Sequence, residues 1–197
     1  MKYSNRFDSA LVFATQLHDG HLRKATDVPY VTHLLAVASL VGEAGGTENE
    51  VIAALLHDAV EDQGGQPTLD KIREMFGDDV AQIVLGCSDT DEVPKPPWKQ
   101  RKEAYIQHVA EASESILLVS CADKLHNARC ILADYREIGD EVWDRFTATK
   151  EQTLWYYRSL LDVYQRRGVT ARLVNELDRT VKTMEELAGK SGPMVRI

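Results

Sequence analysis

The sequence predicts an all-α protein, and three observations support that fold class. Apolar residues recur at helical spacings along most of the chain, no stretch shows the strict alternation of a β-strand, and glycine and proline are few, at 12 and 6 of 197 residues. The apolar and charged fractions, 44% and 27%, are typical of a globular protein. We expect a single domain over residues 1–197, with its core at about 7–168.

The first two helices are expected on either side of a short polar loop. Apolar residues at 7–18 follow a helical period, and Asp19-Gly20 ends it. Residues 25–28 form the loop, and Pro29 is well placed to open the second helix. The glycines between 42 and 46 are expected to end that helix.

The third helix contains the most informative stretch of the chain, VIAALLHDAVEDQ at residues 51–63. Thr47 is a favourable N-cap because acidic residues follow it in the first turn, and we expect one continuous helix from there to Gly64. Its apolar run is interrupted by four polar residues: His57, Asp58, Glu61 and Asp62. Charge in a core helix is costly unless it meets a partner, a metal ion or water in a cleft.

The second half of the chain continues the helical pattern around one loop. Thr68 is a candidate cap for a short helix that ends at Gly77. Residues 88–97 hold three prolines and several acidic residues, which favours a loop. The remaining helices are expected at residues 80–87 and 98–112, around the segment CADKLHNARCIL, at 141–168 as one long or broken helix, and at about 170–188.

A divalent metal ion would explain the polar residues of the core. Separate helices supply His33, the pair His57-Asp58, and Asp123. Mixed imidazole and carboxylate ligands suit a first-row divalent ion such as manganese or iron, and zinc also fits. Taken one at a time, each residue has an ordinary structural explanation, for example a hydrogen-bonded core histidine. The combination of the four within apolar helices favours metal binding.

Five segments together resemble the HD-domain metal-dependent phosphohydrolases, and within them the hydrolase domain of RelA/SpoT proteins and the small alarmone hydrolases. The segments are ATQLHDGHLRK, PYVTHLLAVA, VIAALLHDAVEDQ, FGDDVAQIVLG and SCADKLHNAR, which span most of the chain from about Phe7 to Trp155. The resemblance implies a bundle of roughly eight to ten helices with a central metal site.

The resemblance also implies roles for individual residues. It implies metal ligands at His33, His57, Asp58 and Asp123. Glu61 and Asp62 are similar to the acidic pair beside the reacting phosphate, where they would position water or carry a proton. Arg23, Lys24 and Asn127 are similar to residues that hold the nucleotide.

A basic cluster at Lys99, Arg101 and Lys102 stands out in an acidic chain. Lys102 and its neighbours could contact the distal phosphates of a nucleotide. The cluster could equally be a solvated helix face, and the sequence does not decide between the two.

Two positions depart from the family pattern. RelA/SpoT proteins usually have a glycine within a residue or two after the Arg-Lys pair, whereas this chain has Ala25-Thr26-Asp27, which restricts the backbone more. Cys130 stands where the family often has threonine, and a thiol is a weaker hydrogen-bonding group than a hydroxyl.

The leading hypothesis is a manganese-dependent hydrolase that removes the 3′-pyrophosphate of guanosine tetra- or pentaphosphate, (p)ppGpp, and leaves GDP or GTP. One alternative is an HD phosphohydrolase that acts on a nucleoside monophosphate or a dinucleotide phosphate, because the metal machinery does not fix the substrate. Another is a catalytically silent nucleotide-binding protein with a structural metal. The presence of both Glu61 and Asp62 favours an enzyme.

Charge and cysteine content set expectations about partners and location. The formal net charge of −8 argues against nucleic-acid binding. The three cysteines show no CxxC spacing, and the N-terminal residues lack a signal-peptide pattern, so we expect a cytoplasmic protein without a membrane anchor. The oligomeric state is not indicated by the sequence.

Overall fold

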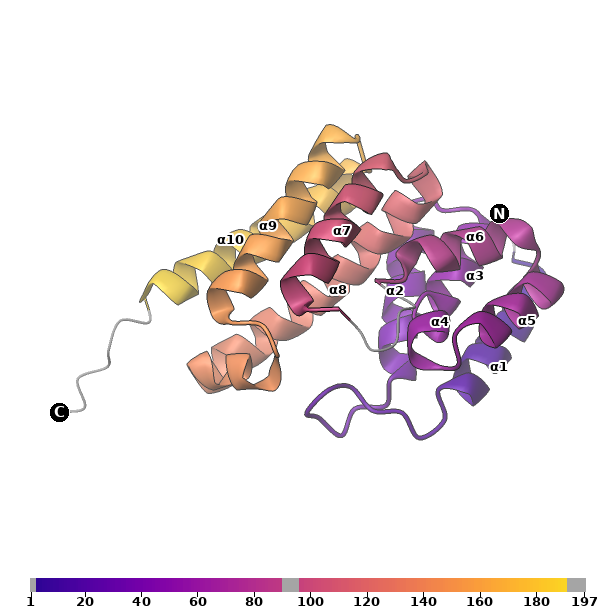
Figure 1. Ribbon diagram of the computed structural model, residues 1–197, viewed down its shortest axis with the longest axis horizontal. Coiled ribbons are helices and arrows are strands. Elements are labelled where there is room, and N and C mark those ends of the chain that lie inside the picture. Colours follow the sequence, from indigo (N-terminus) through magenta and orange to yellow (C-terminus); the bar gives the residue numbers. More distant parts are fainter. Residues whose placement is uncertain (1–2, 90–95, 191–197) are drawn as a thin grey trace.

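The computed structural model describes residues 3–89 and 96–190, and these ranges are helical apart from loops and one isolated bridge between Leu22 and Pro29. The helices are α1 (Asn5–Leu17), α2 (Val31–Glu43), α3 (Glu48–Leu56), α4 (Ala59–Asp62), α5 (Gln66–Phe76), α6 (Asp78–Cys87), α7 (Trp98–Glu111), α8 (Glu114–Ile138), the 3₁₀ helix η1 (Gly139–Arg145), α9 (Lys150–Arg166) and α10 (Ala171–Lys190). The all-α prediction is confirmed (Figure 1). No helix in the described ranges combines the length and apolarity needed to cross a membrane.

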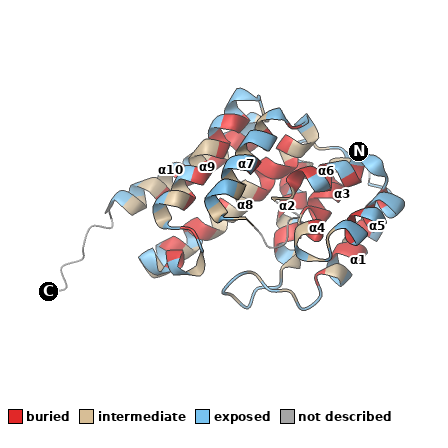
Figure 2. Ribbon diagram, in the orientation of Figure 1, coloured by how far each residue is buried: buried red, intermediate tan, exposed pale blue. Residues whose placement is uncertain are grey.

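Helix α3 is the centre of the N-terminal half. It packs against α1, α2, α6 and α8, and its residues Val51 to Leu56 are all buried (Figure 2). Thr47 caps it as predicted, with Glu50 completing a capping box. Burying a side chain the size of Leu55 stabilises the fold by about 1.5–3 kcal/mol, so this short helix anchors the residues that follow it.

Helix α8 joins the two halves of the molecule. Its 25 residues contact α2, α3 and α6 on one side and α9, α10 and η1 on the other. Figure 1 shows α8 running between the N-terminal helices and the pair formed by α9 and α10. Side chains along α8 can therefore contribute to a site formed between the two halves.

Residues 48–63 do not form one continuous helix, which corrects the prediction. Helix α3 ends at Leu56, and α4 begins at Ala59, with His57 and Asp58 between them. Successive residues of a regular helix point about 100° apart, so an unbroken helix would aim His57 and Asp58 in different directions. The interruption allows both side chains to approach the same point.

Two other predicted boundaries were wrong. Pro29 does not open α2; it pairs with Leu22 in the isolated bridge, and the helix begins at Val31. Thr68 lies inside α5, where its hydroxyl donates to the carbonyl of Gln63 at 2.6 Å instead of capping the helix.

The helix expected at 141–168 as one long or broken element is broken: it is divided into η1 and α9, and Thr149 forms a capping box at the start of α9. The expected loop at 88–97 falls largely on residues 90–95, which lie outside the described ranges.

Candidate metal centre and active site

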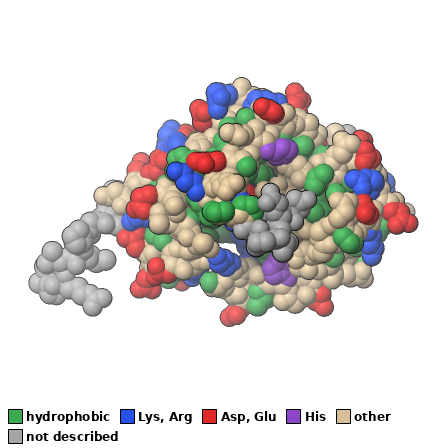
Figure 3. All heavy atoms as spheres, in the orientation of Figure 1, with side chains coloured by type: hydrophobic (Ala, Val, Ile, Leu, Met, Phe, Trp, Pro, Cys, Tyr) green, Lys and Arg blue, Asp and Glu red, His purple; other side chains and the backbone are tan. Residues whose placement is uncertain are grey.

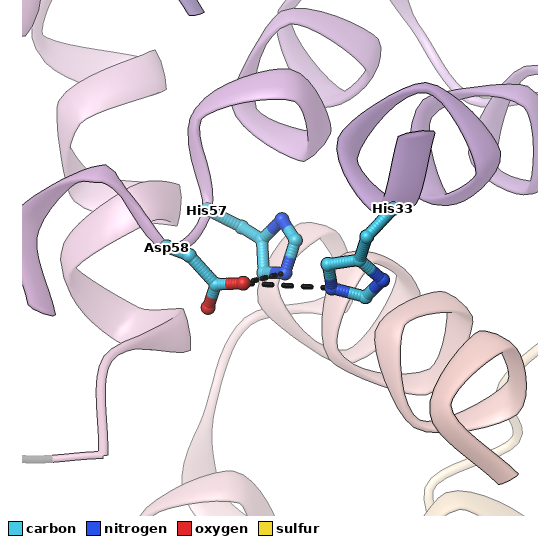
Figure 4. Close-up of side chains that lie close together, drawn as sticks. All are labelled: His33, His57 and Asp58. Atoms are coloured by element: carbon cyan, nitrogen blue, oxygen red, sulfur yellow. Dashed lines mark ion pairs between the residues drawn. The ribbon is translucent and has the colours of Figure 1, made fainter. Parts of the chain in front are cut away.

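Two histidines and one aspartate meet where α2, α3 and α4 come together. His33 comes from α2, and His57 and Asp58 form the α3–α4 junction. One ligand atom from each lies within 4.8 Å of the other two (Figure 4). Nε2 of His57 is 2.9 Å and Nε2 of His33 is 3.5 Å from Oδ2 of Asp58. This spacing brings three ligands, two imidazoles and one carboxylate, that suit a divalent ion to one point.

The two imidazoles present unsatisfied nitrogens to this point, which is the observation that fits a cation. Nε2 of His33 and Nε2 of His57 are buried without a hydrogen-bond partner among the described residues. Nδ1 of His57 lies 2.9 Å from the carbonyl oxygen of Ala54, so Nδ1–H donates there and Nε2 is directed at the cluster. An unpaired buried polar atom costs stability, and a bound ion would remove that cost.

Asp123 approaches the same centre from α8. Its Oδ1 lies 3.2 Å from Nε2 of His33 and 3.6 Å from Nε2 of His57. Its carboxylate is also held by Lys124 and by Nδ2 of Asn127, each at 2.5 Å. All four predicted ligands therefore lie together, but Asp123 is outside the tightest three-residue group, and its role as a ligand stays a prediction.

The charged groups of the centre shift one another's pKa values. Burial alone would lower the pKa of His57, but Asp58 and Asp123 raise it well above its usual value. Burial alone would raise the pKa of Asp58, but His57 and His33 hold it well below its usual range. Asp123 behaves likewise, chiefly because of Lys124. Both carboxylates are thus ionised and available at neutral pH.

A cavity of about 600 Å³ opens beside the centre. Its lining includes all four residues predicted to hold a nucleotide: Arg23, Lys24, Lys102 and Asn127. Figure 3 shows a hollowed face of the molecule with basic, histidine and hydrophobic side chains around it. A cavity of this size with several cations in its wall suits a small anionic ligand.

Comparison with known proteins identifies the family. A family model described as an HD domain matches residues 10–154, which is most of the chain. This chain belongs to the HD-domain family. The matched range includes the adjacent His57 and Asp58 of the three-residue cluster.

Curated relatives within the HD-domain family are similar over different lengths. The chain is 33% identical over 180 residues to the guanosine-3′,5′-bis(diphosphate) 3′-pyrophosphohydrolase MESH1 of Xenopus tropicalis, covering 87% of this chain and 93% of that protein. It is 39% identical over 121 residues to a probable GTP pyrophosphokinase of Mycobacterium leprae, of which it spans only 15%. The similarity to MESH1 therefore extends over nearly all of that protein, whereas the similarity to the Mycobacterium leprae protein is confined to one part of a longer chain.

Solved structures agree with this assignment. A structure described as a metazoan ortholog of SpoT that hydrolyses ppGpp superposes with a TM-score of 0.75 at 28% identity, covering 92% of this chain and 97% of that one. A protein of Listeria monocytogenes gives a TM-score of 0.67 at 30% identity, covering 78% of this chain.

The predicted acidic pair, Glu61 and Asp62, lies on the short helix α4, which begins directly after Asp58. Glu61 is half-buried, and its Oε2 accepts a hydrogen bond from the backbone N–H of Asp89 at 3.3 Å. Asp62 is exposed. The pair is thus placed next to the ligands without belonging to the three-residue cluster, and its catalytic role stays a prediction.

The basic cluster of α7 divides into inward-facing and outward-facing side chains. Lys102 lines the cavity, and its Nζ pairs with Asp89 at 3.0 Å. Arg101 also pairs with Asp89. Lys99 is 67% exposed and lies 3.8 Å from Glu103, so it belongs to the solvated face. The solvated-face interpretation therefore fits Lys99, and phosphate contact by Lys102 stays a prediction.

Two residues of the site were missed in the sequence. The hydroxyl of Tyr30 donates to Oδ2 of Asp58 at 2.6 Å, and burial together with Asp58 raises the pKa of Tyr30, so it remains a donor. Its position three residues before His33, on the same side of the chain, was an available signal. Lys124 pairs with Asp123 and also lines the cavity.

The two departures from the family pattern both lie at this cavity or beside it. Ala25 has a φ of +57°, in the left-handed region that glycine adopts most easily. The loop therefore takes a glycine-like conformation even though this chain has alanine there. Cys130 lines the cavity, where its thiol replaces the hydroxyl that the family pattern would supply.

Proposed function

We propose that this chain hydrolyses guanosine tetra- or pentaphosphate at the 3′ position and releases pyrophosphate and GDP or GTP. The observation that carries the proposal is the link between the centre and the cavity: Tyr30 donates to Asp58 and also lines the cavity, together with Arg23 and three further predicted nucleotide-binding residues. A metal centre at the wall of a cationic cavity suits transfer of a phosphoryl group to water.

The similarity to MESH1 supports this substrate over other nucleotides. MESH1 is named for the 3′-pyrophosphohydrolase activity on guanosine-3′,5′-bis(diphosphate), and the alignment covers 93% of its length. The match to a ppGpp-hydrolysing structure over 92% of this chain supports the same conclusion. HD domains act on several classes of phosphate ester, so the substrate itself needs a direct test.

The metal is proposed to be manganese, held by His33, His57, Asp58 and Asp123. When bound, such an ion supplies Lewis acidity, which makes water a better nucleophile and offsets negative charge on a phosphoryl oxygen. The imidazoles and carboxylates of this centre are the donor types that manganese, iron and related ions accept. Tyr30 and Asn127 hold two of the carboxylates in place by donating to them.

Protein side chains carry the protons of the reaction. The oxygen of a water molecule forms a bond to the phosphorus attached to the ribose 3′ oxygen, and the bond between that phosphorus and the 3′ oxygen breaks. The water loses a proton and the 3′ oxygen gains one, so a group that first accepts and then donates is required. Glu61 and Asp62, adjacent to the ligands on α4, are proposed for that role. Arg23, Lys24 and Lys102 neutralise the phosphates.

A substrate panel tests the proposal. Purified protein with manganese is offered guanosine tetraphosphate, nucleoside mono-, di- and triphosphates, and dinucleotide phosphates, with pyrophosphate and orthophosphate measured separately. We expect pyrophosphate and GDP from guanosine tetraphosphate. Release of orthophosphate from monophosphates alone would refute the assignment in favour of another HD phosphohydrolase, and tight nucleotide binding without any product would indicate a silent binding protein.

A further inference from the structure

The cavity contains one carboxylate that the proposed reaction does not use. Among the described residues that line it, Asp134 is the single acidic side chain, whereas five lysines and arginines, including Arg145, share the lining. A carboxylate repels the phosphates that those cations attract. Its presence in an anion-binding cavity therefore indicates contact with a part of the ligand that donates hydrogen bonds.

The position of Asp134 places it away from the phosphate chemistry. Asp123, beside the metal centre, and Asp134 lie on the same helix α8, eleven positions apart. That separation corresponds to about three helical turns, or ~16 Å along the axis. Asn127 and Cys130 line the cavity between them. A nucleotide whose reacting phosphate lies at the metal centre would extend its base along α8 toward Asp134.

Arg145 and Phe146 accompany Asp134 in the lining of the cavity and could together bind a base. Nη1 of Arg145, from the end of η1, donates to Oδ2 of Asp134 at 2.6 Å and so fixes the orientation of the carboxylate. Phe146 follows Arg145 in the chain and lines the same cavity, with Nζ of Lys24 5.9 Å from the centre of its ring. An aromatic ring beside an oriented carboxylate provides one group for stacking and one for hydrogen bonding.

We propose that Asp134, oriented by Arg145, accepts hydrogen bonds from the N1–H and the 2-amino group of a guanine base and thereby selects guanine nucleotides. This inference rests on the proposed function, because it places the base of the same substrate. An ionised carboxylate only accepts hydrogen bonds. Guanine presents two adjacent donors on that edge, whereas adenine presents an unprotonated N1 that would face the carboxylate without a donor. Hypoxanthine keeps N1–H but lacks the 2-amino group.

A structural role is the competing explanation for the Asp134–Arg145 pair. The ion pair could simply fasten η1 to α8, since the two elements pack together. The side chains of Asp134 and Arg145 are 39% and 25% exposed, so such a pair would contribute little to stability. The two explanations differ in whether loss of the carboxylate changes the choice of base.

The test combines one change in the protein with one change in the ligand. The value of kcat/KM is measured for guanosine tetraphosphate and for its inosine and adenosine counterparts, with the wild-type chain and with Asp134→Ala. In the wild type we expect the guanosine compound to be preferred over the inosine compound by about 10- to 100-fold, the contribution of a hydrogen bond to a charged acceptor. In Asp134→Ala that preference should fall to within about threefold, chiefly through KM.

Two control variants separate the explanations. Arg145→Gln breaks the same ion pair but keeps the carboxylate, so it should retain a preference for guanosine over inosine that Asp134→Ala lacks. Glu137→Ala, an exposed acid on the same helix, should leave all three values unchanged. Equal loss of preference in Arg145→Gln and Asp134→Ala, or an unchanged preference in Asp134→Ala, would overturn the inference. Absence of guanosine tetraphosphate hydrolysis in the wild type would instead refute the proposed function.

Discussion

Nη2 of Arg23 donates a hydrogen bond to Oδ1 of Asn127 at 2.6 Å, although 104 residues separate them in the chain. The same Asn127 side chain donates through Nδ2 to Oδ1 of Asp123. One amide therefore links the loop after α1 to a carboxylate of the metal centre. Because an amide has both an acceptor and donors, asparagine can serve the two charged partners at once.

Replacing Asn127 should weaken both nucleotide and metal binding. In Asn127→Ala, Arg23 loses its acceptor and Asp123 loses a donor, so we expect the KM for guanosine tetraphosphate to rise and manganese affinity to fall by about 10- to 100-fold. Steady-state kinetics and calorimetric titration measure the two effects. If only KM or only manganese affinity changes, Asn127 does not couple nucleotide binding to metal binding.

Glu61→Ala should abolish turnover while leaving the metal in place. Loss of a general acid or base typically costs about 10²- to 10⁴-fold in kcat. Elemental analysis and circular dichroism should match the wild type, because Glu61 lies outside the three-residue cluster. Glu74→Ala, an exposed acid on α5, serves as the matched control. Full activity in Glu61→Ala would show that this acid does not carry the proton.

His57→Ala should lose the metal. His57 is 1% exposed and its Nε2 is directed at the cluster, so the substitution removes one of the three converging ligand atoms. We expect substoichiometric manganese in the purified variant, measured by elemental analysis. His108→Ala, in which the lost imidazole lies 3.0 Å from the carbonyl oxygen of Gly86 and outside the three-residue cluster, should keep full occupancy. Full metal occupancy in His57→Ala would refute its role as a ligand.

Metal affinity should increase with pH. Burial opposes protonation of His57, but Asp58 and Asp123 outweigh it and raise its pKa well above the usual value, so the metal-free protein carries a proton there at neutral pH. A metal ligand must be a neutral imidazole, so binding displaces that proton. The apparent affinity should therefore rise by up to about tenfold per pH unit and level off once the pH passes the raised pKa.

Calorimetric titrations in buffers of different ionisation enthalpy measure the released proton directly. An affinity that is constant between pH 6 and pH 8 would show that His57 is already neutral in the metal-free protein.

The same glycine-to-alanine change should have opposite effects on two helices. A Cβ at Gly86 in α6 would lie 2.4 Å from Cδ1 of Ile116, so Gly86→Ala should destabilise the protein by about 1–3 kcal/mol. A Cβ at Gly189 in α10 meets nothing within 4 Å, so Gly189→Ala should stabilise it by up to about 1 kcal/mol. Chemical denaturation measures both values. Equal effects at the two sites would show that the contact with Ile116 relaxes at no cost.

The sequence by itself determined the fold class, most helix positions and the identity of the candidate ligands. Helical periodicity and caps such as Thr47 are local properties, so they can be read without knowledge of the packing. The segments around His33, His57-Asp58 and Asp123 also carried the family resemblance, and the HD-domain match at residues 10–154 confirmed it.

The tertiary structure decided which residues distant in the sequence come into contact, because local patterns hold no information about such contacts. Periodicity predicted one helix through His57 and Asp58, but convergence of two side chains on one point required the break between α3 and α4. The contacts of Tyr30 with Asp58 and of Arg23 with Asn127 join residues 28 and 104 positions apart, and no local preference specifies such pairs. The place of Asp134 in the cavity likewise depends on how η1 packs against α8, which is why its role emerged only from the fold.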